Sequence, residues 1–296
     1  MRVFVTGASG FIGSAVVPEL LSAGHEVIGL ARSDASAAAL KAAGAEVFRG
    51  SLDEPEELAR AAALSDGVIH LAFKHDFENY VANMGTDLAA VETIGAALAG
   101  TGKPFVITSG TLGPAFVAPG VVGTEDSAPP ASVPRVASEI ATLALSERGV
   151  RSSVIRLPPT VHANGQGGFA QALIQIAREK GVSGYVGDGQ NHWPAVHRSD
   201  AARLFRLALE KGAGGKRYHG VQDEGIPMRR LAEVIGAGLN VPTASIAAED
   251  VPAHFGFLAM FAGLDAPSSS KLTREALGWT PTGKGLIEDL ETGTYF

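Results

Sequence analysis

The chain has 296 residues, of which 46% are hydrophobic and 19% are charged, and its formal net charge at pH 7 is −7. This length and composition are ordinary for a globular protein with one large α/β domain, or with a main domain and a small lobe. The negative charge, without a basic cluster, argues against a nucleic-acid surface. Because the sequence contains no cysteine, disulfides, thiolate chemistry and cysteine-ligated metal are excluded.

The N-terminus, MRVFVTGASG, predicts a strand that runs into a glycine loop, without the charged segment of a signal peptide. The most apolar stretch, residues 255–264, is too short to span a bilayer. We interpret it as a buried helix or a lid over a pocket. We therefore expect a cytoplasmic protein that makes no membrane contact.

Short β-like runs alternate with helical stretches over the first half of the chain. We expect strands at 2–7, 25–32, 45–50, 67–72, 104–110 and 152–158, and helices at 11–23, 34–43, from 53 onward, at about 80–100 and at 135–148. The strands are nearly all apolar, which is typical of strands that helices cover on both faces. The alternation predicts the α/β fold class, a doubly wound parallel sheet (Rossmann) with right-handed βαβ units.

After residue 158 the pattern loosens. Glycines are frequent between 160 and 192, where we expect one helix near 168–180, and residues 193–211 read as a strand followed by a helix. We predict a dinucleotide-binding domain over residues 1–158, to which 193–211 return. The remaining ranges, 159–192 and 212–296, are expected to form a smaller C-terminal substrate-binding lobe.

The glycine loop VTGASGFIG places Gly7, Gly10 and Gly13 at G-x-x-G-x-x-G spacing between a strand and a helix. The first glycine permits a tight turn, the second lets the backbone approach a pyrophosphate, and the third lets helix and strand pack closely. The helix N-terminus supplies N–H groups and partial positive charge for the phosphates. We predict a dinucleotide site whose loop contacts are Gly7, Ser9, Gly10, Phe11, Ile12 and Gly13.

The end of the second strand indicates which dinucleotide is bound. An acidic residue there would favour NAD, but the sequence GLARSD has Ala31 in that place, followed by Arg32 and Ser33. A guanidinium matches a ribose 2′-phosphate well. We therefore expect NADP (NADPH) to be preferred, with NAD as the alternative. Arg32 would otherwise be a solvated surface charge.

Motifs along nearly the whole chain resemble those of the extended short-chain dehydrogenase/reductase superfamily, in its NAD-dependent epimerase/dehydratase group. The resemblance rests on TGASGFIG, GSLDEPEEL, VIHLAF, NMGTDLAAVETI, ITSGT, VIRLPPTVHANG, WPAVHRSDAARLFRLAL and SSSKLTREALGWTPTGKGLIEDL. It implies cofactor contacts from Asp53, Leu71, Ala72, Ser109 and Pro158. It also implies that Asn83 occupies the family's structural asparagine position and that Thr111 is the catalytic Ser/Thr.

The chain departs from this family at the Tyr-x-x-x-Lys pair, where it has Arg135 and Glu139. Arginine does not lose its proton in a protein, so Arg135 cannot replace the tyrosine as an acid or base, although it can polarise a carbonyl or hold a ribose hydroxyl. Glu139 lies four residues on, on the same face of the expected helix. Its simplest role is to pair with Arg135, and a catalytic role for the two residues is the alternative.

Other side chains could carry the proton. The loop FKHDFENY offers Lys74, His75, Asp76 and Tyr80, and further histidines stand at 162, 192 and 197. Histidine titrates near neutrality, and the family register places His162 beside the nicotinamide, so His162 is the preferred candidate. Each histidine could instead be a structural residue. Since no two histidines have the i, i+4 spacing of a zinc helix, we predict no metal.

Three functions remain open. The first is an NADP-dependent oxidoreductase acting on a carbonyl or alcohol of a small organic substrate. The second is an epimerase or dehydratase with a tightly held cofactor, acting on a nucleotide sugar. The third is a non-catalytic NADP-binding regulatory protein. The scarcity of charge between residues 251 and 267 favours an apolar small-molecule substrate. As partners we expect only that substrate and a second copy of the chain, in a homodimer.

Overall fold

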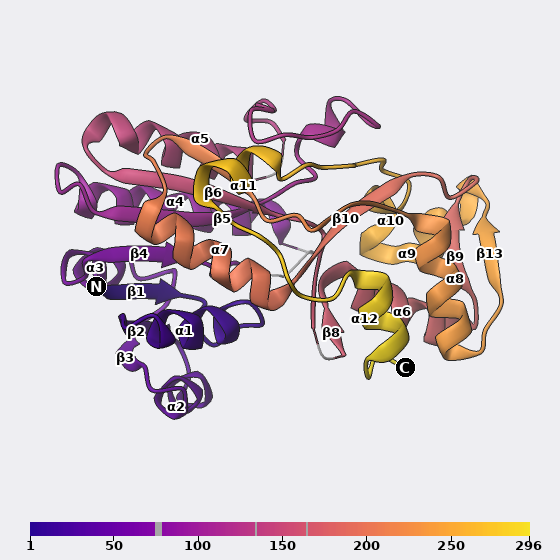
Figure 1. The fold of residues 1–296 in the computed structure, drawn as a ribbon, viewed down its shortest axis with the longest axis horizontal. Coiled ribbons are helices and arrows are strands. Elements are labelled where there is room, and N and C mark those ends of the chain that lie inside the picture. Colours follow the sequence, from indigo (N-terminus) through magenta and orange to yellow (C-terminus); the bar gives the residue numbers. More distant parts are fainter. Residues whose placement is uncertain (75–78, 134, 164) are drawn as a thin grey trace.

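A seven-stranded parallel sheet forms the left half of the molecule in Figure 1, with the strand order β11-β6-β5-β4-β1-β2-β3. The computed structural model describes residues 1–74, 79–133, 135–163 and 165–296. The strands are β1 (Arg2–Thr6), β2 (Glu26–Ala31), β3 (Glu46–Arg49), β4 (Gly67–His70), β5 (Pro104–Gly110), β6 (Arg151–Leu157) and β11 (Lys216–His219). Every neighbouring pair is parallel. The predicted doubly wound α/β fold is confirmed.

Helices cover both faces of this sheet because its strands are apolar on both sides. They are α1 (Gly13–Ser22), α2 (Asp34–Ala42), α3 (Pro55–Ala63), α4 (Tyr80–Leu98), α5 (Val136–Ala144) and α7 (Arg198–Lys211). Residues of α1 and α7 share one core cluster with the sheet. Residues of α3 and α4 share the cluster on the other face. Two 3₁₀ turns, η1 (Pro114–Phe116) and η2 (Leu145–Arg148), stand before and after α5.

A second region with its own apolar core lies to the right in Figure 1. Its four-stranded sheet has the order β12-β10-β7-β8, and β13 pairs with β9. The strands are β7 (Thr160–Ala163), β8 (Gln166–Gly167), β9 (Ser183–Val186), β10 (His192–His197), β12 (Asp223–Pro227) and β13 (Thr243–Ile246). The helices of this region are α6 (Gly168–Lys180), α8 (Met228–Leu239), η3 (Ala248–Asp250), α9 (Val251–Phe255), η4 (Gly256–Leu258), α10 (Ala259–Ala262) and α12 (Leu286–Thr292). Helix α11 (Lys271–Leu277) packs on the large-sheet region instead.

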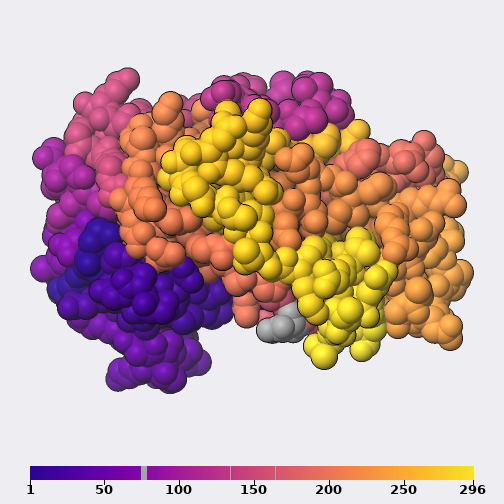
Figure 2. All heavy atoms as spheres, in the orientation of Figure 1, coloured from indigo at the N-terminus to yellow at the C-terminus, as the bar shows by residue number. Residues whose placement is uncertain are grey.

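The C-terminal segment links the two regions on one face of the molecule. In Figure 2 the yellow chain crosses from the sheet region to the lobe. Its helix α11 contacts α7 and β11, and its helix α12 contacts α8, β7 and β10. Among the residues that the structure describes, no helix is both long and apolar enough to cross a membrane.

Two details differ from the sequence expectations. The helix expected at 135–148 begins at Val136, because Arg135 has a left-handed backbone with φ 64°. It continues after Ala144 as the 3₁₀ turn η2. Strand β11 lies inside the range 212–296, which we expected in the lobe, yet it pairs with β6 at the edge of the large sheet. The proposed domain boundaries stay a prediction.

Candidate functional site

The glycine loop between β1 and α1 is packed too closely for side chains at two of its positions. Gly7 has φ 66°, and a Cβ added there would lie 2.7 Å from the backbone nitrogen of Ala72. A Cβ at Gly13 would lie 2.1 Å from the carbonyl oxygen of Gly7. Gly10 is exposed, and its nearest obstacle is that same carbonyl oxygen at 3.2 Å. This geometry fits a dinucleotide, because it leaves bare backbone at the start of a helix for a pyrophosphate.

The neighbouring loop residues are accessible. Ser9 is exposed, and Phe11 and Ile12 are half-buried. The guanidinium of Arg198, from α7, lies over the ring of Phe11 at 4.7 Å. On the opposite side of the loop, Ala72 donates its backbone N–H to Thr6 Oγ1 at 3.2 Å. The loop is thus held between α7 and the segment that follows β4.

The predicted adenosine contacts follow β2 and β3, at the carboxyl edge of the sheet. Arg32 comes directly after β2 and is exposed. The Ser33 hydroxyl accepts the backbone N–H of Ser36 at 3.2 Å and so caps α2. The carboxylate of Asp53 accepts from Lys74 Nζ at 2.6 and 2.9 Å. Lys74, which the sequence offered as a proton carrier, is therefore paired with a predicted cofactor contact. His75 and Asp76 lie outside the described residues.

Glu139 does not pair with Arg135, and this sequence interpretation is wrong. Its carboxylate accepts from Arg156 at 2.7, 3.0 and 3.1 Å, from Arg217 at 3.2 Å and from the Ser109 hydroxyl at 2.6 Å. Burial alone would raise the pKa of Glu139, but the bonds and charge of Arg156, with Ser109 and Arg217, hold that pKa below its ordinary value. We call Ser109, Glu139, Arg156 and Arg217 the α5 cluster.

Arg135 points elsewhere because it stands before the helix in a left-handed conformation. Its Nη2 donates to the carbonyl oxygen of Thr108 at 2.8 Å and lies 3.5 Å from Asp87 Oδ1. Its guanidinium carbon lies 4.3 Å from the ring centre of Phe73. The side chain remains 19% exposed, whereas those of Glu139 and Asp87 are 1% and 2% exposed. Within its pair with Asp87, Arg135 is therefore the member that a substrate could reach.

A buried polar chain connects β1 to α5. Thr6 Oγ1 lies 2.8 Å from His70 Nδ1, and His70 Nε2 lies 3.3 Å from Asp87 Oδ1. The hydroxyl of Ser138 donates to Asp87 Oδ2 at 2.6 Å. Burial alone would raise the pKa of Asp87, but the bond from His70 and the charge of Arg135 hold that pKa below its ordinary value. Asp87 is thus an ionised anchor for Arg135.

The other predicted residues lie at the ends of β5 and β6 or on α4. Thr111 donates its backbone N–H to the carbonyl oxygen of Leu157 at 2.9 Å. The next residue after Leu157, Pro158, is buried. The Thr111 hydroxyl is buried and has no hydrogen-bond partner among the described residues. Asn83 is 7% exposed and lies on α4, one turn before Asp87. Leu71 is half-buried after β4.

His162 lies in a different group of residues. Its Nδ1 is 2.8 Å from Asp289 Oδ2 on α12, and the same oxygen accepts from the Tyr295 hydroxyl at 2.6 Å. Its ring meets the edge of His197 at 5.5 Å, and its Nε2 is buried without a partner among the described residues. Burial lowers the pKa of His162, with Asp289 opposing the shift. We call His162, Asp289 and Tyr295 the α12 cluster. No contact of these side chains reaches Thr111 or Arg135 in the described residues, so the catalytic role of His162 stays a prediction.

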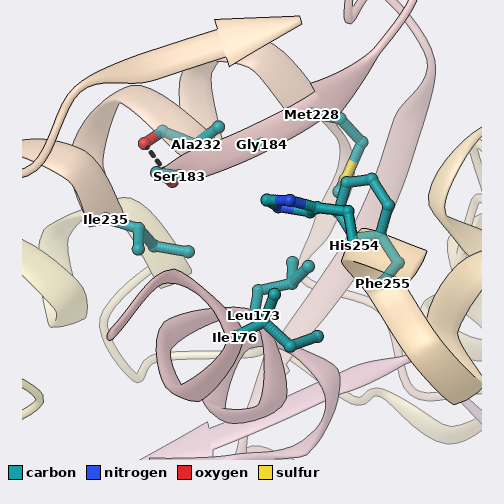
Figure 3. A pocket seen from close by; sticks show the side chains of 9 residues that line it. All are labelled: Leu173, Ile176, Ser183, Gly184, Met228, Ala232, Ile235, His254 and Phe255. Atoms are coloured by element: carbon teal, nitrogen blue, oxygen red, sulfur yellow. Dashed lines mark hydrogen bonds between the residues drawn. The ribbon is translucent and has the colours of Figure 1, made fainter. Parts of the chain in front are cut away.

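A small cavity in the lobe is separate from these residues. Figure 3 shows the imidazole of His254 pointing into it, and its lining contains none of the predicted site residues. Ser183, which also lines the cavity (Figure 3), donates its hydroxyl to the carbonyl oxygen of Ala232 at 2.8 Å. In the described ranges no cluster of three or more His, Cys, Asp or Glu side chains suits a metal ion.

The sequence reasoning missed Asp87, Arg156, His70 and Arg217. Arg156 and His70 carried a usable signal, because each interrupts an apolar strand in VIRLPP and VIHLAF. A charged or polar side chain inside a strand that is covered on both faces must find a buried partner. Asp87 and Arg217 gave no comparable signal.

Comparisons with known proteins agree with this architecture. The model of the NAD dependent epimerase/dehydratase family matches residues 3–221. An uncharacterized protein of Schizosaccharomyces pombe is 48% identical over 297 residues, covering 100% of both chains. A 2-alkyl-3-oxoalkanoate reductase of Stenotrophomonas maltophilia is 29% identical over 261 residues, covering 82% of this chain and 77% of the reductase. The structure of a dTDP-glucose 4,6-dehydratase from Streptomyces venezuelae, with NAD bound, has a TM-score of 0.75 at 21% identity, covering 98% of this chain and 95% of that one.

Proposed function

Because this chain belongs to the NAD-dependent epimerase/dehydratase family, we propose that it is an NADP-dependent oxidoreductase that acts on a carbonyl or alcohol of a small apolar molecule. The observation that carries the proposal is the glycine loop, where Gly7 and Gly13 leave no room for a Cβ beside a helix start. Gly7, Ser9, Gly10, Phe11, Ile12 and Gly13 would hold the pyrophosphate there. When bound, the dinucleotide supplies or accepts a hydride.

The preference for NADP rests on Arg32. It is exposed directly after β2, and its guanidinium has no ion-pair partner in the described ranges. A free guanidinium at this place suits a ribose 2′-phosphate. The Asp53 carboxylate, held by Lys74, would lie at the adenosine end of the same edge.

The choice of an apolar substrate rests on aromatic side chains between the loop after β5 and the lobe. The ring of Phe261 lies 6.0 Å from Phe116 and 5.2 Å from Phe169, and Phe257 lies 6.2 Å from Phe169. Phe257 remains 44% exposed. Phe116 follows Thr111 by five residues, so an apolar group could pack here while its carbonyl meets the Thr111 hydroxyl. The Stenotrophomonas relative, which is named for reducing an oxoalkanoate that carries an alkyl group, supports this substrate class.

The site residues have distinct tasks in this proposal. The Thr111 hydroxyl, which is buried and unpartnered among the described residues, would donate to the carbonyl oxygen. Arg135, held by Asp87, would stabilise the negative charge that develops on the same oxygen. Glu139 binds Arg156 and Arg217, and the Ser109 hydroxyl donates to Glu139, so we assign both residues to holding α5 against the sheet rather than to proton transfer.

The test is a titration of NADPH and NADH against the purified protein, followed by NADPH consumption with a panel of alkyl ketones and aldehydes. We expect NADPH to bind more tightly than NADH, and Arg32→Ala to remove about 1.5–3 kcal/mol of that preference. Gly10→Val should weaken the binding of both cofactors and leave the fold largely intact, because Gly10 is exposed and a Cβ there would meet only the carbonyl oxygen of Gly7, at 3.2 Å. An unchanged preference in Arg32→Ala would contradict the NADP assignment.

The same experiment separates the alternative functions. Binding of NADPH without turnover on any carbonyl would favour the regulatory protein. A cofactor that copurifies and survives dialysis would favour the epimerase or dehydratase. We propose a homodimer in solution, which light scattering on the purified chain would test.

A further inference from the structure

One face of α4 points a tyrosine toward Arg135. Tyr80, Asn83 and Asp87 follow each other at i, i+3 and i+7, a spacing that aligns side chains on one face of a helix. Asn83 and Asp87 are buried, and Tyr80 is half-buried at the first residue of the helix. Since Asp87 binds Arg135, this face of α4 is the one that meets the start of α5.

The ring of Phe73 joins Tyr80 to Arg135. The Tyr80 ring meets it edge-on, with ring centres 6.0 Å apart. The guanidinium of Arg135 lies over the same ring at 4.3 Å. Phe73 stands directly after Ala72, which packs on the glycine loop, so the three side chains gather beside the predicted cofactor site.

We propose that Tyr80 is the catalytic acid of this protein, replacing from α4 the tyrosine that α5 lacks, and that Arg135 is the cation that assists it. The inference rests on the proposed oxidoreductase function. It gives Arg135 a task that its chemistry allows, because a guanidinium cannot release a proton but can stabilise a phenolate.

In the proposed reduction, the phenol of Tyr80 would supply the proton. A bound reduced dinucleotide would supply the hydride to the carbonyl carbon of the substrate, and the π electrons of the carbonyl would move to its oxygen. The O–H bond of Tyr80 breaks, its proton bonds to that oxygen, and its electron pair stays on the phenolate. A proton from solvent then restores the phenol. One ketone, one NADPH and one proton give one alcohol and one NADP⁺.

The electrostatics of Tyr80 agree with a role as acid. Burial raises the pKa of its phenol, the charge of Arg135 lowers that pKa, and Asp87 raises it, with a net increase. The phenol is therefore protonated at neutral pH and ready to donate. Activity should fall only in the alkaline range, above about 10, where an ordinary phenol ionises.

The first arm of the test compares Tyr80→Phe with wild type on a ketone that the wild type reduces. General acid catalysis contributes about 10²–10⁴ in rate, so kcat should fall by that factor while the Kd for NADPH changes by less than about twofold. Tyr185→Phe is the matched control, because Tyr185 also lies near an arginine, Arg229, but in the lobe. A Tyr80→Phe protein that keeps the wild-type kcat would overturn the proposal.

The second arm needs no turnover. The ultraviolet absorbance of tyrosinate is titrated in the apoprotein, and the difference between wild type and Tyr80→Phe reports the phenol of Tyr80. Arg135→Gln should raise the pKa of Tyr80, whereas Arg135→Lys should leave it near the wild-type value, because only the first removes the charge. Equal values in wild type and Arg135→Gln would contradict the assisting role of Arg135.

The two arms also separate this inference from the function on which it rests. If the wild type binds NADPH but reduces no carbonyl, the oxidoreductase proposal fails, and the catalytic role of Tyr80 falls with it. If the wild type reduces a carbonyl and Tyr80→Phe reduces it with the same kcat, the oxidoreductase function stands and Tyr80 is not the acid. If Tyr80→Phe binds NADPH no longer and also melts at a lower temperature than the wild type, Tyr80 has a structural role and the catalytic role is overturned.

Discussion

The carboxylates of Glu139 and Asp289 are both buried, yet they are satisfied in different ways. Glu139, in the α5 cluster, faces two arginines, one of which has a fully buried side chain. Asp289, in the α12 cluster, faces a phenol, which is neutral when it donates, and an imidazole, which carries a charge only when it is protonated. The first cluster therefore buries a fixed ion pair, while the charge of the second depends on whether His162 is protonated.

The comparison teaches what each cluster can tolerate. A charged pair without water is costly to break, since the remaining charge has no solvent to replace its partner. A hydrogen bond from a neutral donor to a carboxylate is weaker than such an ion pair. When it is lost, it leaves an unsatisfied polar group rather than an unpaired charge. The α5 cluster should thus dominate stability, and the α12 cluster should respond more mildly.

The largest expected effect is that of Glu139→Gln. This change leaves Arg156 charged and fully buried, so the free energy of unfolding should fall by about 3–5 kcal/mol. Urea denaturation followed by circular dichroism would measure it. The control is Glu233→Gln, which breaks the exposed i, i+4 pair with Arg229 and should change stability little. Similar losses in both variants would remove the distinction between buried and exposed pairs.

A smaller effect is expected for Asp289→Asn. The change weakens the bonds from His162 and Tyr295 without leaving a buried cation, so it should cost about 1–3 kcal/mol in the same assay. The pH–rate profile of this variant also tests the sequence prediction for His162. If the profile shows a group with a pKa below that of an ordinary histidine, and this pKa changes in Asp289→Asn, His162 is supported as the proton donor.

Counted per unit of pH, the smallest expected effect is a pH dependence of the free energy of unfolding that arises beside the α5 cluster. His219 lies 3.5 Å from Arg156, and its Nδ1 lies 2.9 Å from the carbonyl oxygen of Ser269. Burial, followed by the charge of Arg156, lowers the pKa of His219 to about 3. Because the unfolded chain binds this proton below about 6.5 and the folded chain does not, stability should fall with falling pH by about 1.4 kcal/mol per unit over that window.

The check is denaturation at several pH values between about 6.5 and 4. His162, whose pKa is also lowered by burial, should add to the slope in the same direction. His219→Gln should flatten the wild-type curve, since glutamine does not titrate. A variant with the wild-type slope would show that the acid sensitivity arises at other groups.

The sequence predicted the fold well because the relevant signals are local. The large-sheet strands between β1 and β6 end within a residue or two of the expected positions, since each is an apolar run closed by glycine or polar residues. The glycine loop was predicted for the same reason, because its conformation depends on residues within one turn.

The partners of the charged residues could not be predicted from the sequence. Arg156 and Arg217 reach Glu139 from 17 and 78 residues away, so their pairing depends on the order of β5, β6 and β11 in the sheet. The i, i+4 rule failed for Arg135 and Glu139 because it holds only when both residues are helical. Arg135 is not helical, and the sequence PRVASEI contains no signal that predicts its left-handed backbone.

That backbone conformation has a consequence for protein engineering. In a Tyr-x-x-x-Lys pair on a continuous helix, the two side chains lie one above the other, so two substitutions at 135 and 139 would be expected to install such a pair. Here residue 135 stands before the first helical residue with φ 64°, so a tyrosine there would leave the α5 face and follow Arg135 toward α4. A lysine at 139 would bring a third positive charge beside Arg156 and Arg217. A working Tyr-x-x-x-Lys pair therefore cannot be installed at 135 and 139 by substitution alone, because the start of the helix would also have to be rebuilt.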